Sequence, residues 1–330
     1  MKNQRKPYFF GKTIVITGAS SGVGKATAEA FAAEGADLVL AARGEEPLND
    51  CAELCRKFGV EVIAVPTDTS IAEEVYHLVE EALKFSGRID CWINNAGVLA
   101  FGKFEEIPIE VSDQIVKTNL LGYMHSAHAV LPVFKRQKKG IMINNISIGG
   151  WMPAPYGTAY TASKFGIRGM VETLQGELSG YPDIHICALY PGFQKSTGID
   201  HAANYSGIKL STPPPAFDPR ELAASMVKTA KNPQQAVYPD WSAVVFKNLY
   251  GMFPGVIRYA SSAALRMIMK RGNEDGTSGN ILQPSEVNMG IDGKTLLPAP
   301  SKVIKIGTAG ILGILAIGFL SYSLFQKRNN

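Results

Sequence analysis

Charged residues and cysteines are scarce in this sequence, and each shortage narrows the class of protein. Charged residues make up 19% of the 330 residues, and the net charge is only +4. A nucleic-acid-binding protein would need a clustered basic surface, so we expect no nucleic-acid partner. The four cysteines, Cys51, Cys55, Cys91 and Cys187, lack the spacing of metal ligands. We therefore expect reduced thiols and no metal site.

Long apolar runs are absent except near the end of the chain. The first residues lack the apolar stretch of a signal peptide. By contrast, Ile306 to Phe325 runs twenty residues without a charge, and as a helix it would span roughly 30 Å, the thickness of a bilayer's hydrocarbon core. We predict a transmembrane anchor with a short tail over 302–330, and a buried core helix is the alternative. The flanking cations divide evenly between the two ends and do not orient the helix: Lys302, Lys305, Lys327 and Arg328.

Strand-like and helix-like segments alternate through residues 1–270. This order predicts an α/β fold of Rossmann type, a doubly wound parallel sheet with helices on both faces. Residues 271–301 are rich in Gly, Asn, Ser, Asp and Pro, and we expect a flexible linker there. The predicted strands are the β-branched and apolar runs at 13–17, 37–42, 61–66, 89–94, 141–148 and 184–189.

A glycine-rich turn joins the first predicted strand to the first predicted helix. Glycines allow a tight bend and a close approach of the backbone to a ligand. The following helix N-terminus presents free N–H groups and a positive dipole end to a pyrophosphate. The position between a strand and a helix therefore favours a dinucleotide site over an ordinary loop. The expected cofactor contacts in this turn are Gly18, Ser20, Ser21, Gly22, Val23 and Gly24.

The ends of the next strands indicate which dinucleotide binds. An acidic residue after the second strand would bind the ribose 2′-hydroxyl, whereas an arginine accommodates a 2′-phosphate. Here Ala42 stands where an acidic residue would bind the 2′-hydroxyl, and Arg43 follows it. We therefore favour NADP(H) over NAD(H). The alternative is that Arg43 is a solvated surface residue. The Asp68 carboxylate could hydrogen-bond to an adenine edge, or it could cap the helix that starts near Ile71. Asn95, Ala96 and Gly97 follow the fourth strand and suit a ligand crevice.

Tyr160 and Lys164 lie four residues apart, which puts both side chains on one face of a helix. A nearby ammonium favours the phenolate and lowers the pKa of the phenol. We therefore predict that Tyr160 exchanges a proton with an alcohol near neutral pH. The spacing alone is common on exposed helices, so this assignment depends on the rest of the chain.

Residues 11 to about 235 resemble the short-chain dehydrogenase/reductase family. The pieces that match occur in the family's order and at its usual separations, including thirteen residues from Ser147 to Tyr160. The motifs that carry the resemblance are Thr17-Gly18-Ala19-Ser20-Ser21-Gly22-Val23-Gly24, Asp68, Asn94-Asn95-Ala96-Gly97, Asn119, Ser147, Tyr160, Lys164 and Pro191-Gly192.

The resemblance implies a catalytic set and its roles. Tyr160 would be the general acid/base, and Lys164 would lower the phenol's pKa and bind the nicotinamide ribose. Ser147 would hold the substrate oxygen, and Asn119 would support a proton path to Lys164. Pro191 and Gly192 would contact the cofactor. The threonine that many relatives carry after this pair has no clear match, because Lys195, Ser196 and Thr197 are crowded together.

The resemblance also implies a substrate lid, which we assign to 196–220, and a homo-oligomer formed through the Tyr160 helix. Aromatic residues interleaved with aliphatics over 241–269 are expected to pack on the core; a membrane or an apolar substrate is the alternative contact.

The whole sequence predicts an NADP(H)-dependent oxidoreductase that interconverts a carbonyl and a secondary alcohol. It would be anchored in a lipid bilayer with its catalytic domain facing the cytoplasm. A lipophilic small-molecule substrate would partition into that bilayer. A nucleotide-binding scaffold without turnover is the alternative function. The alternative to a membrane anchor is a soluble enzyme whose last helix packs on a partner.

Overall fold

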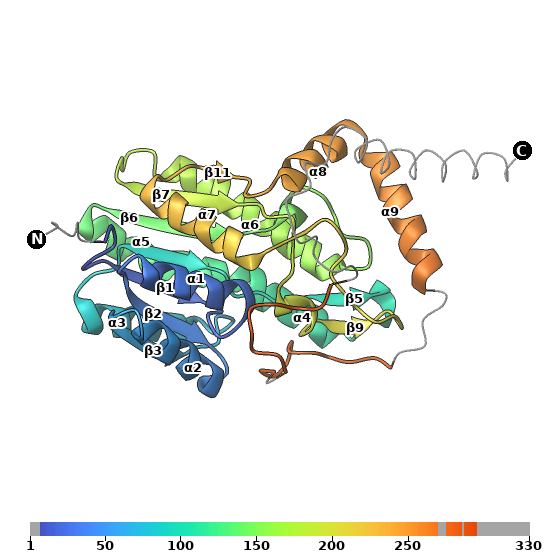
Figure 1. Cartoon of the computed structure of the whole chain (residues 1–330). Helices are drawn as coiled ribbons and strands as arrows, with labels where there is room; N and C mark the ends of the chain where they lie inside the picture. Colours follow the sequence, from blue (N-terminus) through green and yellow to red (C-terminus); the bar gives the residue numbers. More distant parts are fainter. Residues whose placement is uncertain (1–6, 270–274, 286, 296–330) are drawn as a thin grey trace, which may run out of the picture.

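A computed structural model describes residues 7–269, 275–285 and 287–295. Within these residues, seven parallel strands form one sheet in the order β11-β7-β6-β4-β1-β2-β3 (Figure 1). Its centre is a run of apolar strand residues that have almost no contact with solvent, as expected of a parallel sheet covered on both faces. The strands are β1 (Thr13–Thr17), β2 (Asp37–Ala42), β3 (Val62–Pro66), β4 (Cys91–Asn94), β6 (Gly140–Asn145), β7 (Ile184–Leu189) and β11 (Ala236–Val237).

Successive side chains of β1 enter two separate cores because neighbouring residues of a strand point to opposite faces. Ile14 and Ile16 belong to the core under one helix layer, and Val15 belongs to the core under the other. The first layer contains α1 (Gly22–Ala33), α2 (Glu45–Arg56) and α7 (Pro219–Lys231). The second layer contains α3 (Ala72–Ser86), α5 (Gly122–Gln137) and α6 (Thr158–Glu177). The predicted doubly wound α/β fold is confirmed.

The strand order reverses at β1, which pairs with β2 on one side and with β4 on the other. The chain therefore leaves β1 and β4 toward opposite faces of the sheet, and a crevice opens at their carboxyl ends. The turn Gly18–Gly24 follows β1 and the residues Asn95–Gly97 follow β4. The topology thus brings the two predicted halves of the dinucleotide site to one edge.

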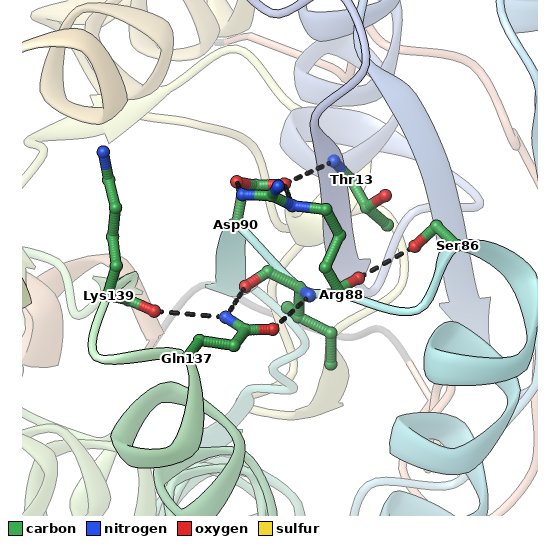
Figure 2. Close-up of polar contacts among 7 residues, drawn as sticks. Thr13, Ser86, Arg88, Asp90, Gln137 and Lys139 are labelled. Atoms are coloured by element: carbon green, nitrogen blue, oxygen red, sulfur yellow. Dashed lines mark hydrogen bonds and ion pairs between the residues drawn. The ribbon is translucent and has the colours of Figure 1, made fainter.

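At the other end of the strands, a polar cluster links the amino ends of β1 and β4 (Figure 2). Asp90 accepts the backbone N–H of Thr13 at 3.0 Å and the Arg88 Nε–H at 2.8 Å. The Gln137 side chain accepts the N–H of Ile89 at 3.0 Å and donates to the carbonyl of the same residue at 2.8 Å. These bonds tie the entries of two neighbouring strands to the end of α5.

Between β4 and β6, two helices are joined by a π turn. α4 (Ile109–Val116) ends at the turn Lys117–Leu121, and α5 begins at Gly122. A π turn inserts one residue into the helical register and often marks a functional site. Here the insertion contains Asn119, which has no solvent contact.

The predicted lid, 196–220, has local structure of its own. The short strand β9 (Ala203–Tyr205) pairs with β5 (Ala100–Gly102), and β10 (Ala216–Phe217) pairs with β8 (Phe193–Gln194). Asp218 caps α7 by accepting the N–H of Arg220 at 2.9 Å, as its sequence position predicts. Three short helical turns complete the description: η1 (Phe104–Glu106), η3 (Ile148–Gly150) and η4 (Thr197–Ile199).

Two helices after β11 extend away from the sheet, and the expectation that 241–269 packs on the core holds only at their start. In α8 (Trp241–Met252), Ser242 and Ala243 are buried. At the junction with α9 (Pro254–Met269), Met252, Phe253 and Val256 are more than half exposed. Figure 1 shows α9 standing at the side of the molecule, well apart from the sheet. The apolar stripe is thus divided between an exposed face and an inner face.

The segment predicted as a flexible linker makes specific tertiary contacts in its described part. Thr277 and Asn204 exchange two backbone hydrogen bonds of 2.8 and 2.9 Å, and Ile281 is completely buried. A linker with little core would lack both features; composition alone missed them because the contacts are to residues far away in the sequence. No helix among the described residues is long and apolar enough to cross a bilayer. The predicted transmembrane segment, 302–330, lies outside the described residues.

Candidate active site

One cavity of about 910 Å³ lies at the carboxyl edge of the sheet. Its size matches that of sites for cofactors and drug-sized ligands. Every residue predicted from the sequence to be catalytic or to bind the cofactor lines this cavity, except Asn119. The topology therefore assembles residues from all parts of the chain between Gly18 and Gly192 in one place.

Tyr160 and Lys164 occupy the base of the cavity on α6, four residues apart as predicted. The ammonium Nζ of Lys164 lies 5.6 Å from the centre of the Tyr160 ring and donates to the carbonyl of Asn145 at 3.2 Å. Lys164 is 5% exposed, so its charge is held almost out of water. Burial lowers the pKa of Lys164 to about 7.

The pKa of Tyr160 departs from the direction expected from the sequence. Burial raises it above its ordinary value, and a hydrogen bond with Ser147 partly offsets this rise. The expectation that Lys164 lowers it is wrong for this arrangement. The phenol is thus kept protonated, which suits a group that donates a proton to an oxygen.

Ser147 follows β6 in a strained conformation, with φ 89° and ψ 157°. A positive φ is uncommon for a residue with a side chain, and such strain is concentrated at functional sites. The turn ends the strand at Asn145, three residues before the predicted end, and directs the hydroxyl toward Tyr160. The neighbouring Gly149 is needed here because a Cβ at that position would lie 3.2 Å from the Tyr160 ring.

Asn119 lies behind the cavity and connects two of its walls. Its Oδ1 accepts the N–H of Val98 at 2.8 Å, and its Nδ2 donates to the carbonyl of Val98 at 2.9 Å and to Ser163 Oγ at 3.1 Å. Asn119 therefore fixes the loop after β4 against α6, next to Lys164. The proton path that the family resemblance implies for Asn119 stays a prediction.

The glycine-rich turn forms a cradle that side chains would fill. A Cβ at Gly18 would approach the Ala96 Cα to 2.8 Å, and one at Gly24 would meet the Gly18 carbonyl at 1.9 Å. Gly22 begins α1 and has a φ of 53°. The residues therefore fit a dinucleotide, whose pyrophosphate needs this close backbone approach and the helix N-terminus.

The loops after β1 and β4 are joined by hydrogen bonds. Thr17 Oγ1 accepts the backbone N–H groups of Asn95 and Ala96, at 3.0 and 3.2 Å. Asn95 Nδ2 donates to the carbonyls of Thr17 and Gly18, both at 3.2 Å. Gly97 lies beside Asn119 and Lys164, 3.4 and 3.8 Å from where its Cβ would be. These bonds make the cradle rigid before any ligand arrives.

Arg43 and Asp68 line the adenosine end of the cavity. Arg43 is partly buried, and burial lowers the pKa of its guanidinium although the nearby Asp68 carboxylate opposes the shift. Both of its terminal nitrogens donate to the backbone carbonyls of Asn280 and Ile281. Asp68 Oδ1 accepts the Ser70 N–H at 2.9 Å, so this carboxylate supports the turn before α3 and still lines the cavity. Asp68 does not cap α3, whose N-cap is Ile71 and has no side-chain cap bond, whereas a contact with an adenine edge stays a prediction.

Pro191 and Gly192 connect the cofactor end of the cavity to the catalytic end. The carbonyl of Pro191 accepts the N–H of Ile148 at 2.8 Å, and Gly192 donates to Asp240 Oδ2 at 2.7 Å. Among the crowded residues that follow, Ser196 lies against the glycine-rich turn, with its Oγ 2.4 Å from where a Gly22 Cβ would be.

Sequence reasoning missed two parts of the site. Asn145 joins the catalytic and cofactor regions: its carbonyl accepts Lys164 Nζ, and its side chain donates to Asn95 Oδ1 at 3.0 Å. Its position at the end of a strand, two residues before Ser147, was an available signal. The second part is the segment 275–295, which supplies Asn280, Pro284, Ser285 and Met289 to the cavity wall and carries no sequence motif.

Comparison with known proteins identifies the family. The short chain dehydrogenase family model matches residues 12–206. The 11-beta-hydroxysteroid dehydrogenase A of Sesamum indicum is 38% identical over 249 residues, which cover 72% of this chain and 70% of that protein. The chain spans 53% of the length of 11-beta-hydroxysteroid dehydrogenases 1A and 1B of Arabidopsis thaliana, which are 35% identical.

Solved structures agree with this fold. A Burkholderia phymatum short chain dehydrogenase/reductase in complex with NAD is 25% identical, with a TM-score of 0.68 over 76% of this chain and 96% of that one. An alcohol dehydrogenase from the archaeon Thermococcus sibiricus, complexed with 5-hydroxy-NADP, is 30% identical with a TM-score of 0.61, over 69% and 95% of the chains. The chain belongs to the short-chain dehydrogenase/reductase family and is an NAD(P)-dependent oxidoreductase acting on CH–OH donors.

Proposed function

We propose that this protein is an NADP(H)-dependent oxidoreductase that interconverts a bulky apolar carbonyl compound and its secondary alcohol. The observation that carries the proposal is the convergence of Ser147, Tyr160 and Lys164 at the base of a cavity whose other end is the glycine-rich cradle. NADP(H), when bound, supplies or accepts the hydride. The chain's own residues supply placement and the proton.

Tyr160 is positioned to donate its phenolic proton to a substrate oxygen, and its raised pKa keeps that proton available across the neutral range. Ser147 shares the hydrogen bond with Tyr160 and holds the same oxygen. Lys164, with a pKa of about 7, exchanges protons readily at neutral pH and can restore the proton that Tyr160 gives up. Placement of this kind supplies a large part of an enzyme's rate.

Arg43 supports the preference for NADP(H). Its guanidinium lines the adenosine end of the cavity, and Ala42 offers no carboxylate to a ribose 2′-hydroxyl. We expect Arg43→Ala to raise the dissociation constant of NADPH at least tenfold and that of NADH by less than twofold. Fluorescence titration measures both, with the exposed Arg136→Ala as the matched control. Equal losses for the two dinucleotides would contradict the preference.

The substrate end of the cavity supports an apolar substrate. Its lining includes side chains of α8 and α9, among them Phe246, Leu249, Ile257 and Leu265, and Phe101 from β5. A substrate that buries its apolar surface against these side chains would gain about 25 cal/mol of binding free energy per Å² buried. The printed name of the Sesamum indicum relative is that of a hydroxysteroid dehydrogenase, so fused-ring ketones and alcohols belong in the substrate panel.

The test is an NADPH- and NADH-oxidation screen over ketones, aldehydes and steroid-like carbonyl compounds. We expect Tyr160→Phe to lower kcat by about 10² to 10⁴, the usual contribution of a positioned general acid. The dissociation constant of NADPH should change little. Tyr181→Phe removes a hydroxyl from an exposed residue on the same polypeptide and should retain full activity. Full activity of Tyr160→Phe would disprove the mechanism, and dinucleotide binding without turnover of any substrate would favour a scaffold.

The location of the enzyme is a separate part of the proposal. The uncharged run 306–325 supports a C-terminal membrane anchor, with the catalytic domain on the cytoplasmic side and a lipophilic substrate drawn from the bilayer. We expect the full chain to sediment with membranes and resist carbonate extraction, and a chain ending at residue 301 to stay in the supernatant. Recovery of the full chain without detergent would contradict the anchor.

We also propose a homo-oligomer formed through α6 and α5. Their outer surfaces expose Phe165 and Met124, and Leu121 of the π turn before α5 is exposed as well. Gly169 of α6 has open space around the position of a Cβ, which permits close approach of a second helix. Apolar side chains of this size are usually covered when they share one face.

A further inference from the structure

The segment formed by the described residues 275–285 and 287–295, called the strap below, forms part of the cavity wall. In Figure 1 it is the orange-red chain that returns from α9 toward β9 and α1. It is attached to the lid at both ends: Thr277 pairs with Asn204, and the N–H of Thr212 donates to the carbonyl of Lys294 at 3.1 Å. An ion pair of Asp292 with Arg220 at 2.9 Å adds to the second attachment.

The middle of the strap is attached to the glycine-rich turn. The N–H of Gly22 donates to the carbonyl of Gly290 at 2.8 Å, and Lys25 Nζ donates to the carbonyl of Met289 at 3.3 Å. Both donors belong to the first turn of α1, where a helix presents free N–H groups and a positive dipole end. The strap therefore contacts the element that carries the predicted pyrophosphate site.

A third attachment holds the adenosine end. Arg43 donates from both terminal nitrogens to the carbonyls of Asn280 and Ile281. The Ile281 side chain is completely buried in a small apolar cluster with Val98 and Ala203. This anchor fixes the two carbonyls, and the carbonyls in turn fix the direction of the guanidinium.

The cavity persists beneath the strap. Asn280, Pro284, Ser285 and Met289 form part of its wall, and the cavity between the strap, the cradle and the catalytic residues has a volume of about 910 Å³. A dinucleotide in this space would lie with the glycine-rich turn on one side and the strap on the other.

We propose that the strap is a gate for the cofactor: NADP(H) enters and leaves only when the strap detaches from Gly22, Arg43 and the lid. The proposal rests on the function proposed above, because it concerns the same dinucleotide site. Since the strap bonds to both the lid and the cradle, its opening also couples exchange of the cofactor to movement of the lid. Lids of this kind often determine the rate of product release.

Two substitutions loosen the strap at independent points. A Cβ in Gly293→Ala would lie 2.1 Å from the backbone carbonyl oxygen of Ser196, so the strap has to move away. Ile281→Ala removes the buried anchor near the adenosine end. Gly176→Ala is the matched control, because it makes the same change on α6, outside the cavity lining, with no atom within 4 Å.

The measurement is the rate of NADPH release from the full chain in detergent, followed by stopped-flow fluorescence after mixing with excess NADP⁺. We expect both Gly293→Ala and Ile281→Ala to release NADPH at least tenfold faster than the wild type. Binding should accelerate as well, because a gate slows passage in both directions. Gly176→Ala should release NADPH at the wild-type rate. Circular dichroism spectra and melting curves verify that each variant is folded.

Each outcome supports or overturns the gate. Unchanged release rates in both folded variants overturn it. Tighter binding of NADPH with an unchanged release rate also overturns it and identifies the strap as a competitor for the donors of Gly22 and Arg43. If the wild type binds NADH in place of NADPH, the same measurement is made with NADH. Failure of the wild type to bind either dinucleotide overturns the proposed function, and the gate with it.

Discussion

At the scale of one residue, Lys164 shows that a group with the pKa needed for proton transfer can destabilise the folded state. An ammonium that is 5% exposed and has a backbone carbonyl as partner has lost most of its hydration. Its pKa falls to about 7 from an ordinary value of 10.5. The folded state therefore binds this proton more weakly than the unfolded chain does, and Lys164 destabilises the fold wherever it is charged.

The pH dependence follows from this difference. Below pH 7 both states carry the proton, and the destabilisation is present in full. Between pH 7 and about 10.5 only the unfolded chain binds the proton, so the wild type gains stability as the pH rises. We expect Lys164→Met to raise the free energy of unfolding by up to about 4 kcal/mol at pH 6, and by progressively less toward pH 10.

Urea unfolding of wild type and variant at pH 6, 8 and 10, without cofactor, measures this effect. Lys139→Met at an exposed position is the control and should change the free energy of unfolding by less than about 0.5 kcal/mol at every pH. A gain for Lys164→Met that is independent of pH would show that its cause is packing and not the charge. The same variant should have lost activity.

At the scale of elements, the two edges of the sheet have different tasks. The carboxyl edge carries glycines, amides and the strained Ser147, which together form the cavity. The amino edge carries the polar cluster of Figure 2, which aligns the entries of β1 and β4. Fixing the strands at one edge positions the loops at the other, because a strand transmits its register along its length.

This division predicts separate effects of substitutions at the amino edge. Asp90→Ala removes the acceptor for the Thr13 N–H and the partner of Arg88, and leaves a partly buried donor without a bond. We expect the free energy of unfolding to fall by about 1–3 kcal/mol, while KM for NADPH stays within twofold of the wild type. The exposed Asp113→Ala is the control. A large change in KM would mean that the two edges are not independent.

At the scale of the whole molecule, apolar side chains are exposed on the outer face of α5 and α6 and at the junction of α8 and α9, where Phe253 and Val256 are exposed. The inner face of α8 and α9 lines the cavity.

The proposed oligomer gives a prediction for the intact protein. Phe165→Glu places a charge on the exposed stripe of α6, where a desolvated carboxylate would be costly in an interface. We expect the mass measured by light scattering, corrected for detergent, to fall from that of a dimer or tetramer to that of one chain. Phe58→Glu, on an exposed residue after α2, should retain the wild-type mass. A single-chain mass for the wild type would contradict the oligomer.

Several features could be read from the sequence because the signals that specify them are local. The spacing of Tyr160 and Lys164 within one helix, the strand–turn–helix around Gly18–Gly24 and the β-branched strands depend only on neighbouring residues. They predicted the fold class and the catalytic and glycine-rich residues that line part of the cavity. Strand ends were less predictable, since the turn at Ser147 that ends β6 depends on its contacts in the cavity.

Other features were decided only by the tertiary structure. Burial, and not the charge four residues away, sets the direction of the Tyr160 pKa, because desolvation depends on what packs around the ring. The strap has the composition of a linker, yet the carbonyls of Asn280 and Gly290 meet donors more than 200 residues earlier. Bonds of that separation leave no periodic pattern in a sequence. The local sequence therefore determined which reactive side chains the site contains. Long-range packing determined the pKa values of those side chains and which distant segments form the cavity wall around them.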